Sequence, residues 1–169
     1  EDENLPFVGA IFDGLTPIYI KRDPSDIDRG NGLIHAAMAR GDNIILAPEG
    51  VVSPGRVVRR FHSAFLQPAV DRAKPVHYGS ITATTPEGSA PASKVVLYGP
   101  DPYLRTPDGK IPESELEAWG PERSFLLHFL RLLAQPGFEV TVRFAPHPIL
   151  GTDRRSLALD LHHAVQEIF

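Results

Sequence analysis

An apolar run ends in an ionisable side chain near the middle of this chain. Residues 43–47 are Asn-Ile-Ile-Leu-Ala, and Pro48, Glu49 and Gly50 follow directly. In open α/β sheets, ligands lie at the carboxyl ends of strands, where loops carry polar groups. A glycine at such a place permits positive φ and a close approach of the backbone to a ligand. The pattern therefore predicts a binding site at this turn.

The carboxylate and the glycine of the turn each have two possible roles. Glu49 accepts hydrogen bonds from the hydroxyls of a ligand, or it orders the loop by pairing with an arginine. We favour the ordering role. The backbone N–H of Gly50 faces an anion, or Gly50 only permits a tight turn.

Cationic side chains lie on both sides of the turn. Arg22 follows the apolar segment 17–21. Its guanidinium is a planar fork of donors that matches phosphate oxygens; the alternative is a solvated arginine paired with Asp23 or Asp26. Beyond the turn, a basic cluster faces lipid head groups or an acyl carrier, or else forms an ordinary solvated surface. Its members are Arg56, Arg59 and Arg60.

The composition excludes several classes of site and partner. Cysteine is absent, so there is no disulfide, thiolate metal site or thiol nucleophile. A net charge of −4 weighs against nucleic acid as a partner. No segment approaches the roughly 18 apolar residues of a membrane span. The neighbours His162 and His163 do not face one ion on a helix, so we expect no metal site.

Strands and helices are expected to alternate within one domain, residues 1–169. Apolar and β-branched runs predict strands at 17–21, 43–47, 76–82, 94–99 and 138–144. Capping and periodicity signals predict helices at 24–40, 63–73, 124–134 and 153–168. Such alternation predicts an α/β fold with a mostly parallel mixed sheet flanked by helices. The unbroken apolar run 43–47 is expected to be buried on both faces of that sheet.

Two of the predicted helices carry informative apolar surfaces. The helix that starts at 151–153 carries one apolar face, made of Leu157, Leu161, Ala164 and Ile168. The helix at 124–134 is apolar nearly all round. We favour core packing for it over contact with a membrane or an acyl chain, because it lacks a clear basic face.

Taken in order, these segments resemble the glycerolipid (lysophospholipid) acyltransferase family, typified by the 1-acylglycerol-3-phosphate acyltransferases. Residues 47–50 with Ser53 resemble that family's Phe-Pro-Glu-Gly block, and residues 18–22 resemble the arginine-ended block before it. Residues 61–69 resemble the segment that follows, and residues 74–76 resemble its last block. The resemblance covers nearly the whole chain.

The family's catalytic His-x-x-x-x-Asp block is missing from these residues. Only His162 has an acidic residue five positions on, Glu167, and on a helix those two side chains point about 140° apart. We expect the catalytic segment to precede Glu1, so that this chain begins inside a larger protein. General acid–base help contributes roughly 10²–10⁴ in rate, so this chain alone should have little or no activity.

The resemblance implies transfer of a fatty acyl group from acyl-CoA or acyl carrier protein to a lysophospholipid or glycerol-phosphate type of acceptor. The acyl donor is a co-substrate, and no cofactor is implied. Acceptor binding would then fall to Arg22, Glu49, Gly50 and Ser53. The expected location is the cytoplasmic face of a membrane. Two rivals remain: a non-catalytic lipid- or phosphate-binding descendant, and an interaction platform within a larger protein.

Overall fold

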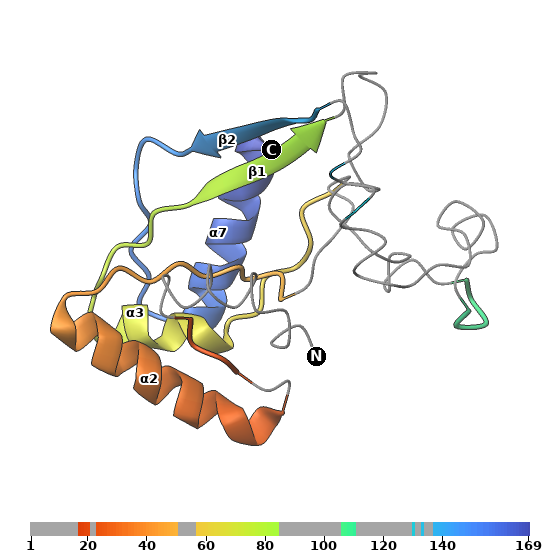
Figure 1. Cartoon of the computed structure of the whole chain (residues 1–169). Helices are drawn as coiled ribbons and strands as arrows, with labels where there is room; N and C mark the ends of the chain where they lie inside the picture. Colours follow the sequence, from red (N-terminus) through yellow and green to blue (C-terminus); the bar gives the residue numbers. More distant parts are fainter. Residues whose placement is uncertain are drawn as a thin grey trace.

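The computed structural model describes residues 17–20, 23–50, 57–84, 106–110, 130, 133 and 137–169. Within them lie three helices, α2 (Ile27–Arg40), α3 (Gln67–Asp71) and α7 (Arg154–Ile168). Two strands are present, β1 (Gly79–Thr84) and β2 (Glu139–Phe144). Short 3-10 turns, η2 (Pro24–Asp26) and η3 (Ala64–Leu66), precede α2 and α3 (Figure 1).

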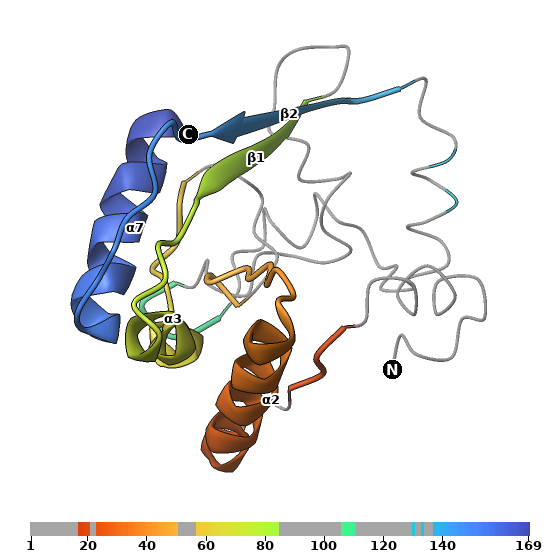
Figure 2. The same ribbon diagram turned by 90° about the vertical axis from the view of Figure 1, so that its left-hand side faces the viewer.

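The two strands form an antiparallel pair beside the C-terminal end of α7 (Figure 2). Ile81 lies opposite Val142, and one isolated bridge continues the pairing between Val76 and Ile149. Ser80 is buried, and its hydroxyl donates to the backbone oxygen of Ile168 at 3.2 Å. Since neighbouring residues of a strand point to opposite faces, Ser80 faces α7, whereas Ile81 points the other way and is 70% exposed.

The prediction of a mostly parallel sheet flanked by helices is wrong. In the described part of the chain, the only sheet is the antiparallel pair of β1 and β2. Neither of the segments 17–20 and 43–47 forms a strand. Ile45 is 98% exposed, whereas the prediction buried it between helices. An apolar run predicts that a segment can be buried, but the core here is filled mainly by helices. The predicted strand at 94–99 lies outside the described residues.

The hydrophobic core is formed where α7 packs on η3. Its buried members are Leu66, Leu157, Ala158 and Leu161. Half-buried apolar side chains from other segments complete it: Leu46, Phe61, Val70, Val76, Tyr78 and Ile149. The face predicted for the last helix is thus right at Leu157 and Leu161, but Ala158 and Val165 are buried instead of Ala164 and Ile168.

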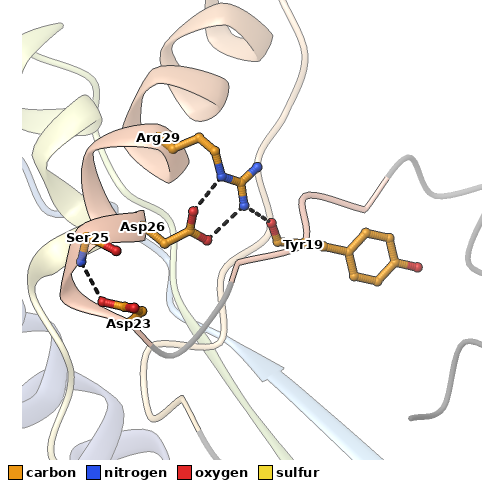
Figure 3. Close-up of polar contacts among 5 residues, drawn as sticks. All are labelled: Tyr19, Asp23, Ser25, Asp26 and Arg29. Carbon is orange, nitrogen blue, oxygen red and sulfur yellow. Dashed lines mark hydrogen bonds and ion pairs between the residues drawn. The ribbon is translucent and has the colours of Figure 1, made fainter.

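Helix α2 ends where the sequence predicts, but residues 24–26 of the predicted helix form η2, so the α-helix begins at Ile27. Gly41 ends it at φ 90°, in the left-handed region that favours glycine. At the other end, Asp23 accepts a hydrogen bond from the N–H of Ser25 at 2.9 Å. The carboxylate of Asp26 holds Arg29, whose Nη2 also donates to the backbone oxygen of Tyr19 at 2.7 Å (Figure 3). The guanidinium of Arg29 thus connects the segment 17–20 to α2.

The predicted helix at 63–73 is present but shorter. It consists of η3 and α3 and ends at Asp71. Ser63 occupies the position before η3 but makes no capping hydrogen bond, and Pro68 lies in the first turn of α3, as expected from its missing N–H. The strand predicted at 138–144 is confirmed as β2, and the one at 76–82 starts three residues late, at Gly79. Of the helix predicted at 124–134, only Leu130 and Leu133 lie within the described residues, and both are helical.

Two glycines of α2 give a matched test of its packing. A Cβ at Gly30 would lie 2.8 Å from Phe65 Cε1 and 3.1 Å from Ile20 Cδ1, whereas one at Gly32 would meet nothing within 4 Å. We expect Gly30→Ala to lower the free energy of unfolding by about 1–3 kcal/mol through overpacking. Gly32→Ala should raise it by about 0.5–1 kcal/mol, because alanine loses less entropy in a helix. Urea unfolding measures both; equal effects would contradict this packing.

The N-cap of α7 predicts a pH dependence of stability. Hydrogen bonds from the N–H and the hydroxyl of Ser156, and from the N–H of Arg155, lower the pKa of the Asp153 carboxyl. A carboxylate with a lowered pKa stabilises the fold above its unfolded-state pKa, and this contribution is lost as the pH falls through the folded-state pKa. Asp153→Asn keeps a capping oxygen that does not titrate.

Thermal unfolding of the two proteins should therefore diverge. Between about pH 5 and pH 2, the melting temperature of the wild type should fall more steeply than that of Asp153→Asn. At neutral pH, Asp153→Ala should melt roughly 2–4 °C below the wild type because the cap is lost. Parallel pH profiles for wild type and Asp153→Asn would show that the cap does not contribute.

Candidate functional site

The turn predicted as a site is a tight turn that supports a neighbouring segment. The N–H of Gly50 donates to the oxygen of Ala47 at 3.1 Å, and Gly50 has φ 67°. A Cβ there would lie 3.3 Å from Cδ2 of His62. Gly50 is therefore required both by its backbone conformation and by the closeness of His62. Of its two possible roles, the tight turn is the one that the geometry displays.

The carboxylate of Glu49 orders the segment 57–63. Its Oε1 accepts the backbone N–H of Arg59 at 3.0 Å, in a half-buried position. In the same turn, the backbone oxygen of Pro48 accepts the N–H of His62 at 2.8 Å. This hydrogen bond from the backbone N–H of Arg59 agrees with the favoured ordering role of Glu49.

Helix α7 holds the same segment from the other side. His162 Nε2 lies 3.3 Å from the backbone oxygen of Val58. A carbonyl oxygen only accepts, so Nε2 carries the hydrogen and Nδ1 of the neutral ring is an acceptor. The ring of Phe61 meets that of His162 edge to face, with centroids 5.4 Å apart. The segment 57–63 is therefore fixed between the turn and α7.

A surface pocket of about 270 Å³ opens between this segment and α7. The segment contributes Arg60, Phe61 and Ser63 to its lining. Helix α7 contributes the rest: Arg155, Ala158, Leu159 and His162. The described lining thus combines two guanidinium groups, a hydroxyl and an imidazole with apolar walls, and no carboxylate is among these residues. The two guanidinium groups and the hydroxyl suit an anion attached to an apolar group, whereas Nε2–H of His162 already faces the oxygen of Val58.

The structure brings together only some of the residues predicted for the site. Arg60 lines the pocket, Arg59 is held by Glu49, and Gly50 supports His62. Arg22, Ser53 and Arg56 lie outside the described residues.

Sequence reasoning missed Ser63, Arg155 and His162 as pocket residues. Arg155 stands four positions before Leu159 and seven before His162, the spacing of one helix face. Reading the polar face of the last helix as carefully as its apolar face would have found two of the three.

A histidine–carboxylate pair elsewhere does not replace the missing catalytic block. His35 Nε2 lies 3.1 Å from Asp71 Oδ2, and Arg72 Nε donates to His35 Nδ1 at 3.2 Å. Both ring nitrogens are thus engaged, so neither is open to take a proton from a substrate. Gln67 also donates to Asp71, at 2.7 Å. This cluster joins α2 to α3 and has a structural role.

The described residues contain no group of three or more metal-ligating side chains placed to hold an ion. Nor does any helix among them have the length and apolar character needed to cross a bilayer. Comparisons with protein-family models, with curated proteins and with solved structures give no match.

The support that Glu49 gives to the segment is open to a direct test. Glu49→Ala removes the acceptor for the N–H of Arg59, a charge-assisted hydrogen bond, and should lower the free energy of unfolding by about 1.5–3 kcal/mol. Trypsin should then cleave after Arg59 and Arg60 several times faster. Glu49→Gln keeps an acceptor oxygen and should stay close to the wild type. Equal cleavage rates in all three proteins would contradict the role of Glu49 in ordering the segment 57–63.

Proposed function

We propose that this chain binds a phosphate-bearing amphiphile of the lysophospholipid type, as the acceptor-binding part of a glycerolipid-type acyltransferase. The observation that carries the proposal is the meeting of Arg60 and Arg155 at one pocket whose described lining is otherwise largely apolar and includes no carboxylate. Each guanidinium presents paired donors to phosphate oxygens.

The two arginines are available to a ligand. In the described part of the chain, neither side chain takes part in an ion pair or hydrogen bond. The hydroxyl of Ser63 adds a neutral donor, and Phe61 and Leu159 add apolar surface for the first carbons of a chain. A free inorganic anion would use only the polar half of this pocket, so an amphiphile suits the lining better.

The link to acyl transfer comes from the order of the sequence blocks. Residues 47–50, which resemble the family's Phe-Pro-Glu-Gly block, hold the segment that carries Arg60. The His-x-x-x-x-Asp motif that would supply the base does not occur in the sequence, and the acyl donor would be acyl-CoA or acyl carrier protein. In this proposal the chain supplies the binding of the acceptor. A non-catalytic lipid-binding module is the alternative, and it needs the same pocket.

The same chemistry supports a peripheral association with the cytoplasmic face of a membrane. A lysophospholipid resides in a bilayer, and a cation near an anionic lipid surface contributes about 1 kcal/mol. Arg60 and Arg155 are exposed, so both reach a head group without a rearrangement of the core.

Binding to vesicles tests the proposal. The wild type should sediment with phosphatidylcholine vesicles that contain lysophosphatidic acid, and less with vesicles that contain a monoacylglycerol of the same chain length. Arg60→Ala and Arg155→Ala should each weaken binding about tenfold or more, as expected for loss of a charge-assisted hydrogen bond. Arg154→Ala is the matched control, because Arg154 precedes Arg155 on α7 but does not line the pocket.

Two results would contradict the proposal. One is equal binding to the phosphate-bearing and the neutral lipid, since the phosphate would then contribute nothing. The other is an equal loss of binding in Arg154→Ala and Arg155→Ala, since net charge rather than the pocket would then be responsible. Circular dichroism of each variant should match the wild type, because these side chains are on the surface.

A further inference from the structure

A second recess lies on the other side of the core and takes no part in the function proposed above. Its volume is about 450 Å³, and α2, η3, α3 and the segments 41–46 and 74–77 enclose it. Most of its walls are apolar: Ile34, Met38, Ile44, Leu46, Phe65, Leu66, Ala69, Pro75 and Val76. We call it the α2 groove. A volume of this size, with apolar walls and a few polar groups, is typical of a binding site.

One wall of the α2 groove is an extended segment that has no main-chain partners within the described residues. Residues 43–46 cross the molecule after α2 as an extended run (Figure 1). Ile44 and Leu46 line the groove, whereas Ile45 between them is 98% exposed, which is the alternation of a strand. Within the described residues, no main-chain N–H or C=O of residues 43–46 takes part in a hydrogen bond.

The charges at the rim favour an anionic group. Asp42 also lines the groove, but Arg40 already holds its carboxylate at 2.8 Å. Lys74 lines the same rim and, in the part of the chain that the structure describes, forms no ion pair. His77 lies beside it. A ligand that placed a carboxylate at Lys74 would therefore gain an unopposed partner.

We propose that residues 43–46 and the α2 groove bind an extended, partly acidic peptide of a partner protein by addition of a β-strand. The peptide backbone pairs with the free donors and acceptors of residues 43–46. Its alternate apolar side chains fill the groove beside Ile44 and Leu46, and a carboxylate pairs with Lys74. Strand addition of this kind draws affinity from the main chain and specificity from the side-chain pockets.

Other occupants fit these observations less well. A lipid tail has no donors or acceptors for the main chain of residues 43–46. A second copy of this segment would offer Asn43 to Ala47 and the paired Asp42, but no unpaired carboxylate for Lys74. A peptide with an acidic residue satisfies both requirements.

The probe is a fluorescein-labelled peptide of alternating valine and threonine that ends in glutamate. Fluorescence anisotropy measures its binding to the whole chain. Hydrogen exchange measures how strongly the amides of residues 43–46 are protected when the peptide is present. We expect saturable binding and slower exchange of these amides. The same peptide with N-methyl groups on alternate amides should not bind, because it lacks the main-chain donors.

Variants of the chain distinguish the contribution of the main chain to peptide binding from that of the side chains. Ile45→Pro removes one main-chain donor and should weaken binding about tenfold, since a main-chain hydrogen bond to an exposed edge is lost. Ile45→Ala is its control and should bind like the wild type, because the Ile45 side chain does not line the groove. Lys74→Glu should weaken binding of this peptide and spare a peptide that ends in lysine.

Four outcomes would overturn the proposal: no binding of the peptide, equal binding of its N-methylated form, equal binding to Ile45→Pro and Ile45→Ala, or displacement of the peptide by lysophosphatidic acid. Concentration-dependent dimers that compete with the peptide would assign the groove to a second copy instead. Arg155→Ala should not change peptide binding, so this test is independent of the lipid site.

Discussion

The burial of Leu157 is the contact on which the described parts of this chain depend. Its side chain is 0% exposed and packs with Leu66 from a part of the sequence some ninety residues earlier. Gly151 allows the loop before α7 to lie against it, because a Cβ there would come within 2.7 Å of Leu157 Cβ. Burying one leucine side chain contributes about 1.5–3 kcal/mol. The rotation of α7 that buries Leu157 also turns Arg155 and His162 toward the segment 57–63, since side chains three, four and seven positions apart share one face of a helix. The core and the pocket are thus set by the same helix orientation.

The sequence predicts elements with strong local signals and fails where the partners of an element decide its state. Gly41 ends α2 as expected because only glycine takes φ 90° without strain. The alternation of residues 139–144 likewise predicts β2. Residues 43–47 are apolar and have a high β propensity. A strand forms only where another strand pairs with it, and the sequence pattern does not identify the pairing segment. Here the paired strands are β1 and β2, so the expected parallel sheet is wrong even though two of its five strands were located.

At the candidate site, too, local sequence predicts some features and tertiary contacts decide the others. A carboxylate beside a glycine after an apolar run was a sound indication of a structured turn, and Glu49 does order the chain around it. Which cations would gather near that turn was not predictable from spacing, because Arg60 and Arg155 are almost a hundred positions apart. Their meeting depends on the hydrogen bond between His162 and Val58 and on the packing of Phe61, which are tertiary contacts. Local sequence thus identifies the support of the pocket, and the fold supplies its charge.

Net charge is a poor guide to what such a pocket binds. The chain carries −4 overall, which taken alone would disfavour an anionic ligand. At physiological ionic strength the Debye length is about 8 Å, so carboxylates beyond that distance contribute little to the potential inside a recess. The carboxylate of Asp153, two positions before Arg155, is held by the N–H groups of Arg155 and Ser156 and serves as the cap of α7. Likewise Asp42 at the rim of the α2 groove is paired with Arg40. At the α2 groove, Lys74 forms no ion pair within the described residues, whereas the charge of Arg155 at the other pocket interacts with that of Asp153. The two proposed sites for anionic groups therefore rest on the proximity of individual side chains rather than on the overall charge.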